Sequence, residues 1–383
     1  MEKQILHITN GYWASKLYSE LFLELSNLAI NQTVFIPIRE SEQQGLFSFN
    51  RDNVKLVYSQ VITSPFYRIY FQSKIKKTIQ KIDSQIDVNS FQLIHAHTLF
   101  SDGAVAYYYK KKFNIPYVVT IRNTDVNVFF KYFIHLRKLG VDILKNADKV
   151  IFLSAAYKTR VIKQYISNNI YINSKSEIIP NGLGEFWLNN AFQGIKKLNE
   201  TIYFLYAGEI RKNKNIISII EALNTIKSGK YKFQFDIVGL GLHDEMSYVK
   251  KLKKLVSANK FVNLYPVVQK EELLAYYKKA NIFVMPSFTE SFGLVYIEAL
   301  SQSVPVIYTE NEGFDATFED GFIGKSVNPR DMNNIANGIG YIIENYERIQ
   351  QNCSNAIASF SWSDIANRYY KIYSEIIDED TEK

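Results

Sequence analysis

Short apolar runs rich in β-branched and aromatic residues alternate along the chain with longer segments whose apolar residues recur about every 3.6 positions. In the first half, strands are predicted by KQILHIT (3–9), QTVFIPI (32–38), FQLIHAHT (91–98), IPYVVTI (115–121) and DKVIFLS (148–154). The segment ASKLYSELFLELSNLA (14–29) predicts a helix. Strands separated by helices predict right-handed strand–helix–strand units, and therefore a parallel sheet.

The alternation breaks at SEIIPNGLGEFW (176–187), which a polar stretch follows to about Glu200. Clusters of proline, asparagine and glycine mark turns, so residues 176–199 are interpreted as a linker. A second series of predicted strands follows: TIYFLYAG (201–208), YKFQFDIVG (231–239), FVNLYPV (261–267), ANIFVMPS (280–287) and VPVIYT (304–309).

The predicted fold class is α/β, with two doubly wound parallel-sheet domains at residues 1–175 and 200–359. In such sheets ligands bind outside the carboxyl ends of the strands, and two sheets that face each other enclose a cleft. The final helical pattern, FSWSDIANRYYKIYSEII (360–377), is long and aromatic. It either caps the second domain or crosses back to the first.

Composition narrows the class of protein. The chain has 383 residues, which suggests two domains, and 47% of them are hydrophobic and 22% charged, as in soluble globular proteins. No apolar run reaches the roughly 18 residues of a membrane span, and the first residues turn polar too soon for a secretory signal. A single cysteine, Cys353, excludes an internal disulfide framework. We therefore expect a cytoplasmic protein.

A net charge of +7 suits an anionic partner such as a nucleotide or a phospholipid surface. Most lysines are scattered, so solubility explains the charge as well. The sequence contains none of the usual nucleic-acid-binding motifs, and no nucleic-acid partner is expected.

The stretch TESFGLVYIEAL (289–300) places Glu290 and Glu298 eight positions apart, between a buried-strand pattern and a helical one. Free amides at the start of a helix, together with the helix dipole, favour phosphate. Gly293 allows the backbone to approach a ligand closely. The amides expected to be free are those of Ser291, Phe292, Gly293 and Leu294.

A nucleoside diphosphate-sugar is long enough to span this stretch. Its diphosphate would lie at the amides, its ribose hydroxyls at Glu298 and its sugar hydroxyls at Glu290, because carboxylates accept hydrogen bonds from hydroxyls. Two solvated helix glutamates explain the spacing equally well.

Two further loops follow predicted strands of the second half. YAGEIRKNKNI (206–216) carries Arg211, Lys212 and Lys214, which could neutralise a diphosphate leaving group or form a solvated basic loop. DIVGLGLHDEM (236–246) has Gly239 and Gly241 after a strand, but the third glycine of a dinucleotide fingerprint is here Asp244. A tight turn is enough to explain these glycines.

In the first half, Gly11 in ITNGYWASKL (8–17) stands between a predicted strand and a helix. His95 and His97 in HAHTLFSDG (95–103) point to one side of a strand, with no third ligand nearby. A lone histidine is more often structural, and His97 is kept as a candidate site residue. The stretch TIRNTDVN (120–127) gathers polar residues as a site floor or as a capped loop: Arg122, Asn123, Thr124 and Asp125.

The motifs E-SFGLVYI-E, GEIRKNK, IVGLG, VNLYPVVQKEEL and IIPNGL occur in the order typical of the family-4 retaining glycosyltransferases, which the chain resembles over nearly its whole length. The resemblance implies the GT-B fold, two Rossmann-like domains with the donor mostly on the second. It also implies that the final helix, 360–383, crosses back to complete the first domain, with Trp362 near its start.

The resemblance implies roles for individual residues. Glu298 would bind the donor ribose, Glu290 would lie by the donor sugar, and Arg211 and Lys214 would hold the diphosphate. Val268, with Val267, matches the segment that lines the base. Gly11 and Gly239 fall on the donor side; His97, Arg122, Asn123 and Asp125 fall on the acceptor or sugar side.

The chain departs from the family at two of these places. Arg122 in TIRNTD stands where many relatives have a histidine in T-x-H-G-x-D, and Gly11 stands alone where many have two glycines.

The implied reaction moves a hexose-type sugar, with retention, from a UDP-sugar to a glycan or lipid-linked acceptor in cell-surface polysaccharide biosynthesis. The departing phosphate would help to deprotonate the acceptor in a front-face substitution. No metal or other cofactor is expected, because the sequence has no internal Asp-x-Asp. Two alternatives stay open: a nucleotide-sugar epimerase of the same fold, and a non-catalytic two-lobed binding protein.

The segment FYRIYFQSKIKKTIQKI (66–82) has lysines beside isoleucines at helical spacing. Basic amphipathic helices bind anionic lipid, so weak contact with the inner face of the membrane is predicted. An ordinary surface helix that packs its isoleucines is an equal alternative. The residues concerned are Lys74, Lys76, Lys77, Lys81, Ile75, Ile79 and Ile82.

Overall fold

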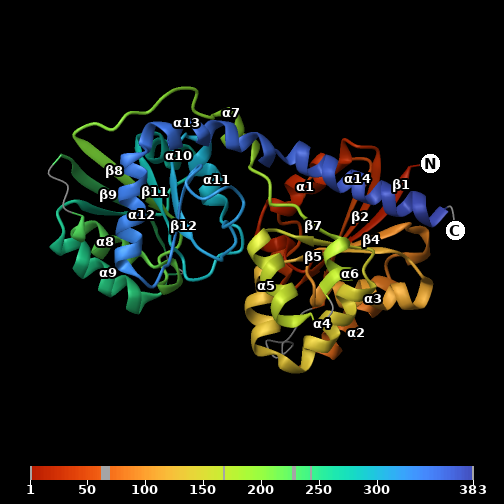
Figure 1. Ribbon diagram of the computed structural model, residues 1–383. Helices are drawn as coiled ribbons and strands as arrows, with labels where there is room; N and C mark the ends of the chain where they lie inside the picture. Colours follow the sequence, from red (N-terminus) through yellow and green to blue (C-terminus); the bar gives the residue numbers. More distant parts are fainter. Residues whose placement is uncertain (1, 62–69, 167–168, 227–229, 242–243, 382–383) are drawn as a thin grey trace. The chain divides into compact units, whose positions relative to one another are not determined.

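The computed structural model describes residues 2–61, 70–166, 169–226, 230–241 and 244–381 (Figure 1). The chain forms two compact units. Unit 1 comprises Met1–Leu153, Tyr157–Gly182 and Trp362–Lys383; unit 2 comprises Ser154–Ala156 and Leu183–Ser361.

Unit 1 is built on a seven-stranded parallel sheet. Its strands, in spatial order, are β3 (Val54–Gln60), β2 (Ile30–Ile38), β1 (Lys3–Ile8), β4 (Leu93–Ala96), β5 (Tyr117–Ile121), β6 (Lys149–Phe152) and β7 (Ser176–Ile178). Its helices are α1 (Leu17–Ser26), α2 (Phe71–Asp83), α3 (Ser101–Phe113), α4 (Arg137–Asn146), α5 (Ala155–Tyr165), α6 (Asn169–Ser174) and α14 (Trp362–Thr381).

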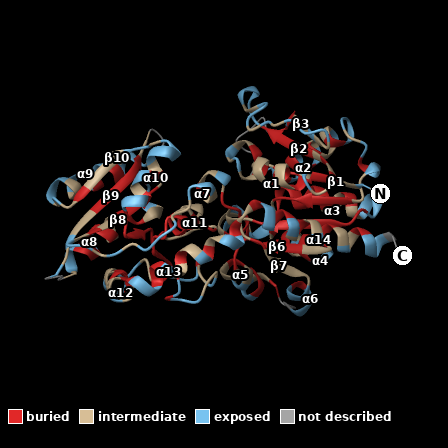
Figure 2. Cartoon of the chain, turned by 90° about the horizontal axis from the view of Figure 1, so that it is seen from above, coloured by how far each residue is buried: buried red, intermediate tan, exposed pale blue. Residues whose placement is uncertain are grey.

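Alternate residues of each unit 1 strand enter two different hydrophobic clusters, as the period of two in a strand requires. Leu6 and Ile8 of β1 pack with α2 to α5, whereas Ile5 packs with α1 and α14. Figure 2 shows the inner strands mostly buried between helices whose outer sides are exposed, whereas the edge strands β3 and β7 are only partly buried. His7 lies two residues after Ile5 on the same strand, so it points to the same side of the sheet, toward α1 and α14.

Unit 2 is built on a six-stranded parallel sheet. Its strands, in spatial order, are β10 (Val262–Pro266), β9 (Lys232–Leu240), β8 (Thr201–Ala207), β11 (Ile282–Val284), β12 (Val306–Thr309) and β13 (Gly324–Val327). Its helices are α7 (Glu185–Asn189), α8 (Ile216–Thr225), α9 (Met246–Ala258), α10 (Lys270–Lys279), α11 (Leu294–Ser301), α12 (Met332–Glu344) and α13 (Tyr346–Ala356).

The predicted fold class is confirmed: both units are parallel sheets with helices. Each strand predicted from the pattern is present, with each end shifted by at most three residues. Three strands escaped prediction: β3, β7 and β13. All three lie at a sheet edge, where a strand buries less apolar surface and needs no continuous apolar run.

The stretch interpreted as a linker is organised differently. Residues Ser176–Ile178 form β7 in the sheet of unit 1, and the chain passes to unit 2 at Gly182–Leu183. Gly182 is held under the indole of Trp362, and a Cβ there would lie 2.3 Å from the ring. The segment 176–182 is thus packed structure of unit 1.

Helix α14 belongs to unit 1, where it packs along α1 (Figure 1). Its buried residues Ile365, Tyr369, Ile372 and Tyr373 repeat at helical spacing and join the cluster on that face of the sheet. The Trp362 indole donates a hydrogen bond to Glu20 of α1 at 2.7 Å. Within the described residues, no helix combines the length and apolar character needed to cross a bilayer.

Candidate functional site

Hydrogen bonds join two loops at the carboxyl ends of β8 and β11 in unit 2. Asn213 Nδ2 donates to the Thr289 carbonyl at 2.9 Å, and Thr289 Oγ1 donates to Asn213 Oδ1 at 2.8 Å. The Phe288 amide donates to the Asn213 carbonyl at 2.8 Å. The loop that contains Lys214 and the loop that contains Glu290 therefore form one rigid piece.

Asn215 holds these two joined loops in place through its backbone conformation and its side-chain hydrogen bonds. Its φ of 56° is left-handed, a region that asparagine tolerates better than most residues. Its side-chain amide donates to the carbonyls of Pro286 and Pro329, at 3.2 and 2.7 Å. The second Asn of the KNKN run thus fixes where the basic loop ends and α8 begins.

Glu290 lies at the centre of this piece. Its Oε2 accepts from Lys214 Nζ at 2.7 Å, and its Oε1 accepts from the Ser291 amide at 3.0 Å. Both side chains are mostly but not fully buried, with 21% of Lys214 and 12% of Glu290 exposed. The structure brings these two predicted residues together as an ion pair that a ligand can still reach.

Glu312 and Gly313, which sequence reasoning missed, hold the backbone of Glu290. Glu312 Oε2 accepts from the Glu290 amide at 3.0 Å, and the Gly313 amide donates to the Glu290 carbonyl at 2.9 Å. A Cβ at Gly313 would lie 2.0 Å from the Ser291 carbonyl oxygen, so only glycine fits without a backbone shift. The available signal was the NEG triplet (311–313), which lies one residue beyond the predicted strand VPVIYT (304–309).

Helix α11 begins directly after the Ser-Phe-Gly turn. Gly293 precedes it with a φ of +80°, and the first helical residue is Leu294, with no side-chain cap. The Ser291 amide is used by Glu290, so of the four expected free amides this one is engaged within the turn. Phe292 packs its ring into the core of unit 2. The uncapped start of α11 still offers amides to an anion.

Glu298 lies on the second turn of α11. Tyr277 of α10 donates its hydroxyl to Glu298 Oε2 at 3.2 Å, with the Val295 carbonyl at 3.3 Å from the same hydroxyl. Burial raises the pKa of Glu298 to about 7, and the Tyr277 bond only partly opposes this. A partly buried carboxylate with spare acceptor capacity fits a diol such as ribose.

The other predicted donor-side residues have mixed surroundings. Arg211 pairs with Glu209 at 2.9 Å, and both side chains are about half exposed. Gly239 has a φ of +133°, and a Cβ there would lie 2.1 Å from the Gly208 carbonyl oxygen. Close packing of β9 on β8 therefore accounts for Gly239. Val268 is partly buried against the core, whereas Val267 is 65% exposed.

Asp244, at the third glycine position of the fingerprint, has a structural role. Its two carboxylate oxygens accept from the amides of Gly241 and Ile210, at 2.7 and 2.9 Å. The carboxylate thus joins the loops after β9 and β8, which agrees with a tight turn.

In unit 1 the structure adds His7 to the two histidines of β4 and its end. His7 Nδ1 lies 3.1 Å from His97 Nε2, and His95 hydrogen-bonds Tyr373 at 2.6 Å and Thr120 at 2.9 Å. All three rings are fully buried. Burial lowers the pKa of His7 to about 3 and holds the pKa values of His95 and His97 well below the usual range.

These three histidines form the one group of three potential metal ligands among the described residues, with nitrogens within 4.8 Å of one another. The expectation that no third ligand lies near His95 and His97 is therefore wrong: parallel pairing places His7 of β1 directly beside His95. Both nitrogens of His95 already have protein partners. The group is a neutral hydrogen-bonded core that ties α14 to the sheet.

Asn123 and Asp125 bind other parts of unit 1. Asn123 Oδ1 accepts from Asn127 Nδ2 at 2.6 Å. Asp125 is buried and accepts from the amides of Leu99, Phe100 and Arg122 at 2.9–3.2 Å, and burial raises its pKa to about 6. The sequence TIRNTD suggests either a site floor or a capped loop. For Asp125 the structure agrees with the capped loop.

Gly11 lies in a loop positioned by a neighbouring carboxylate. Asp102, at the start of α3, accepts from the Asn10 amide at 3.1 Å and from Thr98 Oγ1 at 2.9 Å, and burial raises its pKa to about 7. A Cβ at Gly11 would meet Tyr18 Oη at 3.4 Å, an ordinary contact. The backbone here does not require glycine.

Helix α2 does not present the apolar face that the membrane prediction needs. Ile75 and Ile82 are buried and Ile79 packs against the core of unit 1. Lys74 is buried too, and its Nζ donates to Ser101 Oγ at 2.8 Å. Phe66 and Tyr67 lie outside the described residues. Packing of the isoleucines, the alternative interpretation, is what the structure has.

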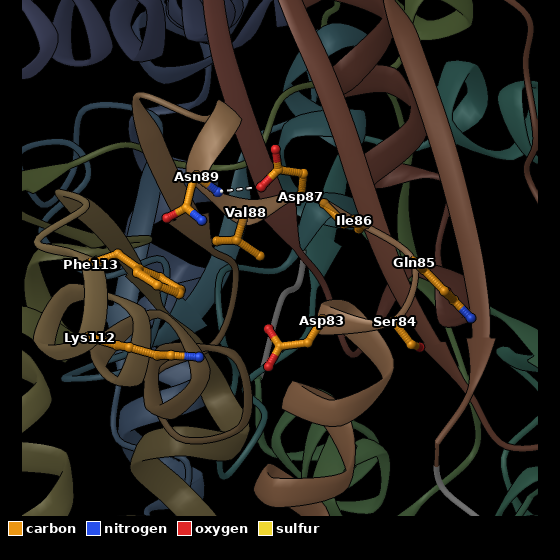
Figure 3. A pocket seen from close by; sticks show the side chains of 9 residues that line it. All are labelled: Asp83, Ser84, Gln85, Ile86, Asp87, Val88, Asn89, Lys112 and Phe113. Atoms are coloured by element: carbon orange, nitrogen blue, oxygen red, sulfur yellow. Dashed lines mark hydrogen bonds between the residues drawn. The ribbon is translucent and has the colours of Figure 1, made fainter.

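A cavity of about 580 Å³ in unit 1 lies away from these loops (Figure 3). Its walls include Asp83, Asp87, Lys112 and Phe113. Residues 83–89 precede β4 and residues 112–113 end α3, so the cavity lies at the amino ends of the strands. Asp87 caps the Asn89 amide at 3.2 Å, and Asp83 accepts from Tyr109. It is not part of the site.

Two Rossmann-like parallel-sheet units are the architecture of the GT-B glycosyltransferases, and comparison with known proteins agrees. A model described as glycosyl transferases group 1 matches residues 189–359, and one described as glycosyltransferase family 4 matches residues 19–183. The chain belongs to the family-4 glycosyltransferases and is an enzyme of that class.

Individual relatives are distant. The chain is 26% identical to the alpha-monoglucosyldiacylglycerol synthase of Acholeplasma laidlawii over 83% of this chain and 82% of that protein. It is 29% identical to the capsular polysaccharide biosynthesis glycosyltransferase CapM of Staphylococcus aureus over 56% and 57%. Among solved structures, Anabaena HepE in complex with UDP superposes with a TM-score of 0.68 at 17% identity, covering 97% of this chain and 100% of that one.

Proposed function

We propose that the protein is a retaining glycosyltransferase that moves a hexose-type sugar from a UDP-sugar to a glycan or lipid-linked acceptor in cell-surface polysaccharide or glycolipid biosynthesis. The observation that carries the donor assignment is the Lys214–Glu290 pair at 2.7 Å, braced by Glu312 and Gly313. The names of the relatives and the UDP bound by HepE support the substrate class.

In this proposal the ammonium of Lys214 and the amides at the start of α11 face the donor diphosphate, with Arg211 at the exposed rim. A fixed cation stabilises the charge that develops on the departing phosphate. Glu290 keeps the Lys214 ammonium oriented toward that phosphate, so the lysine side chain does not need to reorganise during the reaction.

Glu290 would accept hydrogen bonds from the transferred sugar, and Glu298 from the ribose. The pKa of Glu298, raised to about 7, falls when hydroxyl donors bind the ionised form. Neither role needs a metal ion, and we propose catalysis without one. The protein would act in the cytoplasm, with peripheral contact to the inner membrane face.

The test is a donor screen with the full chain. UDP-, GDP- and ADP-sugars are incubated with and without EDTA, and release of free nucleotide is measured. Slow release from UDP-sugars, unchanged by EDTA and accelerated by a glycan or glycolipid acceptor, is expected. Loss of release in EDTA that manganese restores contradicts the metal-free mechanism. Rapid release without any acceptor, together with a rearranged sugar, identifies an epimerase.

A further inference from the structure

Arg122 is held in a fixed orientation at the carboxyl end of β5 in unit 1. Its Nε donates to the His97 carbonyl at 3.2 Å and its Nη1 to Asn181 Oδ1 at 3.2 Å. The guanidinium carbon lies 4.8 Å from the centre of the Tyr18 ring. Stacking and two hydrogen bonds from different parts of the chain leave the side chain little freedom.

The acceptors that hold Arg122 are both neutral. Among the described residues, no carboxylate forms an ion pair with it. The two nearby acids have other partners: Asp125 accepts from three backbone amides, and Asp102 accepts from Asn10 and Thr98 and has Lys74 as its cation. No ion pair therefore neutralises Arg122 within the described part of unit 1, although the carboxylate of Asp125 attracts it electrostatically.

The neighbouring histidines do not neutralise this charge either. Burial and Arg122 itself lower the pKa values of His95 and His97, so both are neutral at physiological pH. A guanidinium has five N–H donors, and two are used here. Nη2 has no hydrogen-bond partner among the described residues, and Arg122 is only partly buried.

Several buried polar atoms of unit 1 also lack a hydrogen-bond partner among the described residues. At this edge of the sheet they include His97 Nδ1 and Asn10 Oδ1, as well as Thr9 Oγ1. The His97 carbonyl holds Arg122, and the Asn10 amide is held by Asp102. Buried polar groups in proteins almost always have partners, so unsatisfied ones on the same edge of the sheet as a cation with unused N–H donors are consistent with a bound polar ligand.

We propose that Arg122 is the receptor for an anionic oxygen group of the substrate, a carboxylate or a phosphate, and that the enzyme selects an anionic substrate. The inference rests on the proposed transfer reaction. It adds that the substrate group bound by unit 1 is negatively charged. Planar, stacked arginine recognises carboxylate and phosphate through parallel hydrogen bonds. Two sources share this chemistry: a uronic-acid sugar, and a phosphate-bearing acceptor.

The first experiment measures anion binding and does not depend on turnover. Full-length protein with 13C- and 15N-labelled arginine is titrated with methyl phosphate, glucuronate and neutral methyl glucoside while guanidinium NMR signals are observed. Wild type should bind at least one anion and not the neutral sugar. In Arg122→Gln that binding should weaken at least about tenfold. Binding of glucuronate alone identifies a uronic-acid sugar, and of methyl phosphate alone a phosphate-bearing acceptor.

Arg137→Gln is the matched control. Arg137 is a partly buried arginine of unit 1 whose Nε donates to the Phe130 carbonyl at 2.7 Å and whose guanidinium lies 5.3 Å from the Tyr165 ring. Arg137→Gln should bind the same anion or anions as wild type does. If Arg122→Gln does not fold, Arg122→Lys replaces it, with an expected loss of about three- to tenfold, because lysine retains the charge but not the planar fork.

Wild type that binds neither anion, or an Arg122 variant that binds as wild type does, overturns the inference. An equal loss in Arg137→Gln also overturns it. UDP binding, measured on the same samples, reports on unit 2 and should be unchanged in Arg122→Gln. Normal UDP-sugar turnover with anion binding independent of Arg122 refutes only this inference, whereas absence of UDP-sugar binding refutes the proposed function.

Discussion

The carboxyl edges of the two sheets differ in how their charged and titratable side chains are arranged. In unit 2 the edge carries charges that are paired and reachable, as in Lys214 with Glu290 at 2.7 Å. In unit 1 the edge carries three fully buried neutral histidines and one arginine without a carboxylate partner among the described residues. Under the proposed function, unit 2 would stabilise charge that develops during the reaction, whereas unit 1 would offer a rigid edge with one cation.

The rigidity of the two edges also has different sources. In unit 2, short side chains such as Asn213 and Thr289 join loop to loop. Carboxylates hold backbone amides at both edges, as Asp244 and Glu312 do in unit 2, but in unit 1 His95 also ties α14 to the sheet through Tyr373. Damage to unit 2 should therefore appear first in turnover, and damage to unit 1 first in stability.

The largest effect is expected from Gly313→Ala. Its Cβ would meet backbone atoms of Ser291 at 2.0 and 2.2 Å, so the Glu290 turn must move. A displacement of about 1 Å at reacting groups costs about 100-fold in rate, and turnover should fall by at least that much. Steady-state kinetics measure it.

Gly340→Ala is the control, because a Cβ at this position of α12 has no atom within 4 Å. It should leave turnover unchanged and add up to about 1 kcal/mol to the free energy of unfolding. Wild-type turnover in a folded Gly313→Ala protein would remove the Glu290 turn from the mechanism.

The second prediction separates the two glutamates of unit 2. Glu298→Gln removes a charged acceptor worth about 1.5–3 kcal/mol, so UDP affinity should fall about 10- to 150-fold. Glu290→Gln should leave UDP affinity nearly intact but lower turnover at least about tenfold, because free UDP lacks the transferred sugar. Calorimetry and kinetics on both folded variants test this. Equal effects on UDP binding refute the assignment of roles.

The third prediction uses opposite pH dependences in the two units. His7 has a pKa of about 3 when folded, below its unfolded value, so its contribution to stability is present above about pH 6.5 and is lost on acidification. Glu298 has a folded pKa of about 7, above its unfolded value, so its contribution is present at acid pH and is lost as pH rises through 7.

His7→Gln should therefore reduce the acid loss of stability of unit 1 between pH 6.5 and 5 by about 2 kcal/mol, at about 1.4 kcal/mol per pH unit. Glu298→Gln should make unit 2 less sensitive to a rise from pH 5 to 8. Hydrogen exchange followed by mass spectrometry resolves the two units. If the two substitutions change the pH dependence of stability in the same direction, the contrast between the two units is wrong. Asp102 and Asp125, with pKa values raised to about 7 and 6, oppose the histidines in unit 1 and should be tested as asparagines.

The smallest effect concerns the membrane. The apolar face of α2 is buried, so only its basic side is available, through exposed Lys76 and partly exposed Lys77 and Lys81. Electrostatic attraction to anionic lipid is worth about 1 kcal/mol per lysine near the surface. Substitution of all three by glutamine should reduce sedimentation with anionic vesicles severalfold. No excess over neutral vesicles with wild type ends the membrane proposal.

Local patterns in the sequence determined much of unit 2. The apolar runs located five of its strands, β8 to β12. The ESFG turn placed Glu290 at the end of a strand, because a turn is determined by adjacent residues. The sequence also put Lys214 and Glu290 in loops at the carboxyl ends of strands, which a parallel sheet returns to one edge, but it did not predict their ion pair. Edge strand β13 lacked the apolar run that burial on both faces imposes.

Only the tertiary structure decided which distant residues meet. His7 and His97 are 90 positions apart, and Glu290 and Glu312 are 22 apart across two strands. Neither pair has a periodic signature, because the sheet register and the strand order set such contacts. Burial decided the rest: it made the histidines neutral, turned Asp125 and Asp102 into backbone caps, and put the isoleucines of α2 into the core. A sequence specifies which side chains are present, but their solvation, and hence their chemistry, depends on what packs against them.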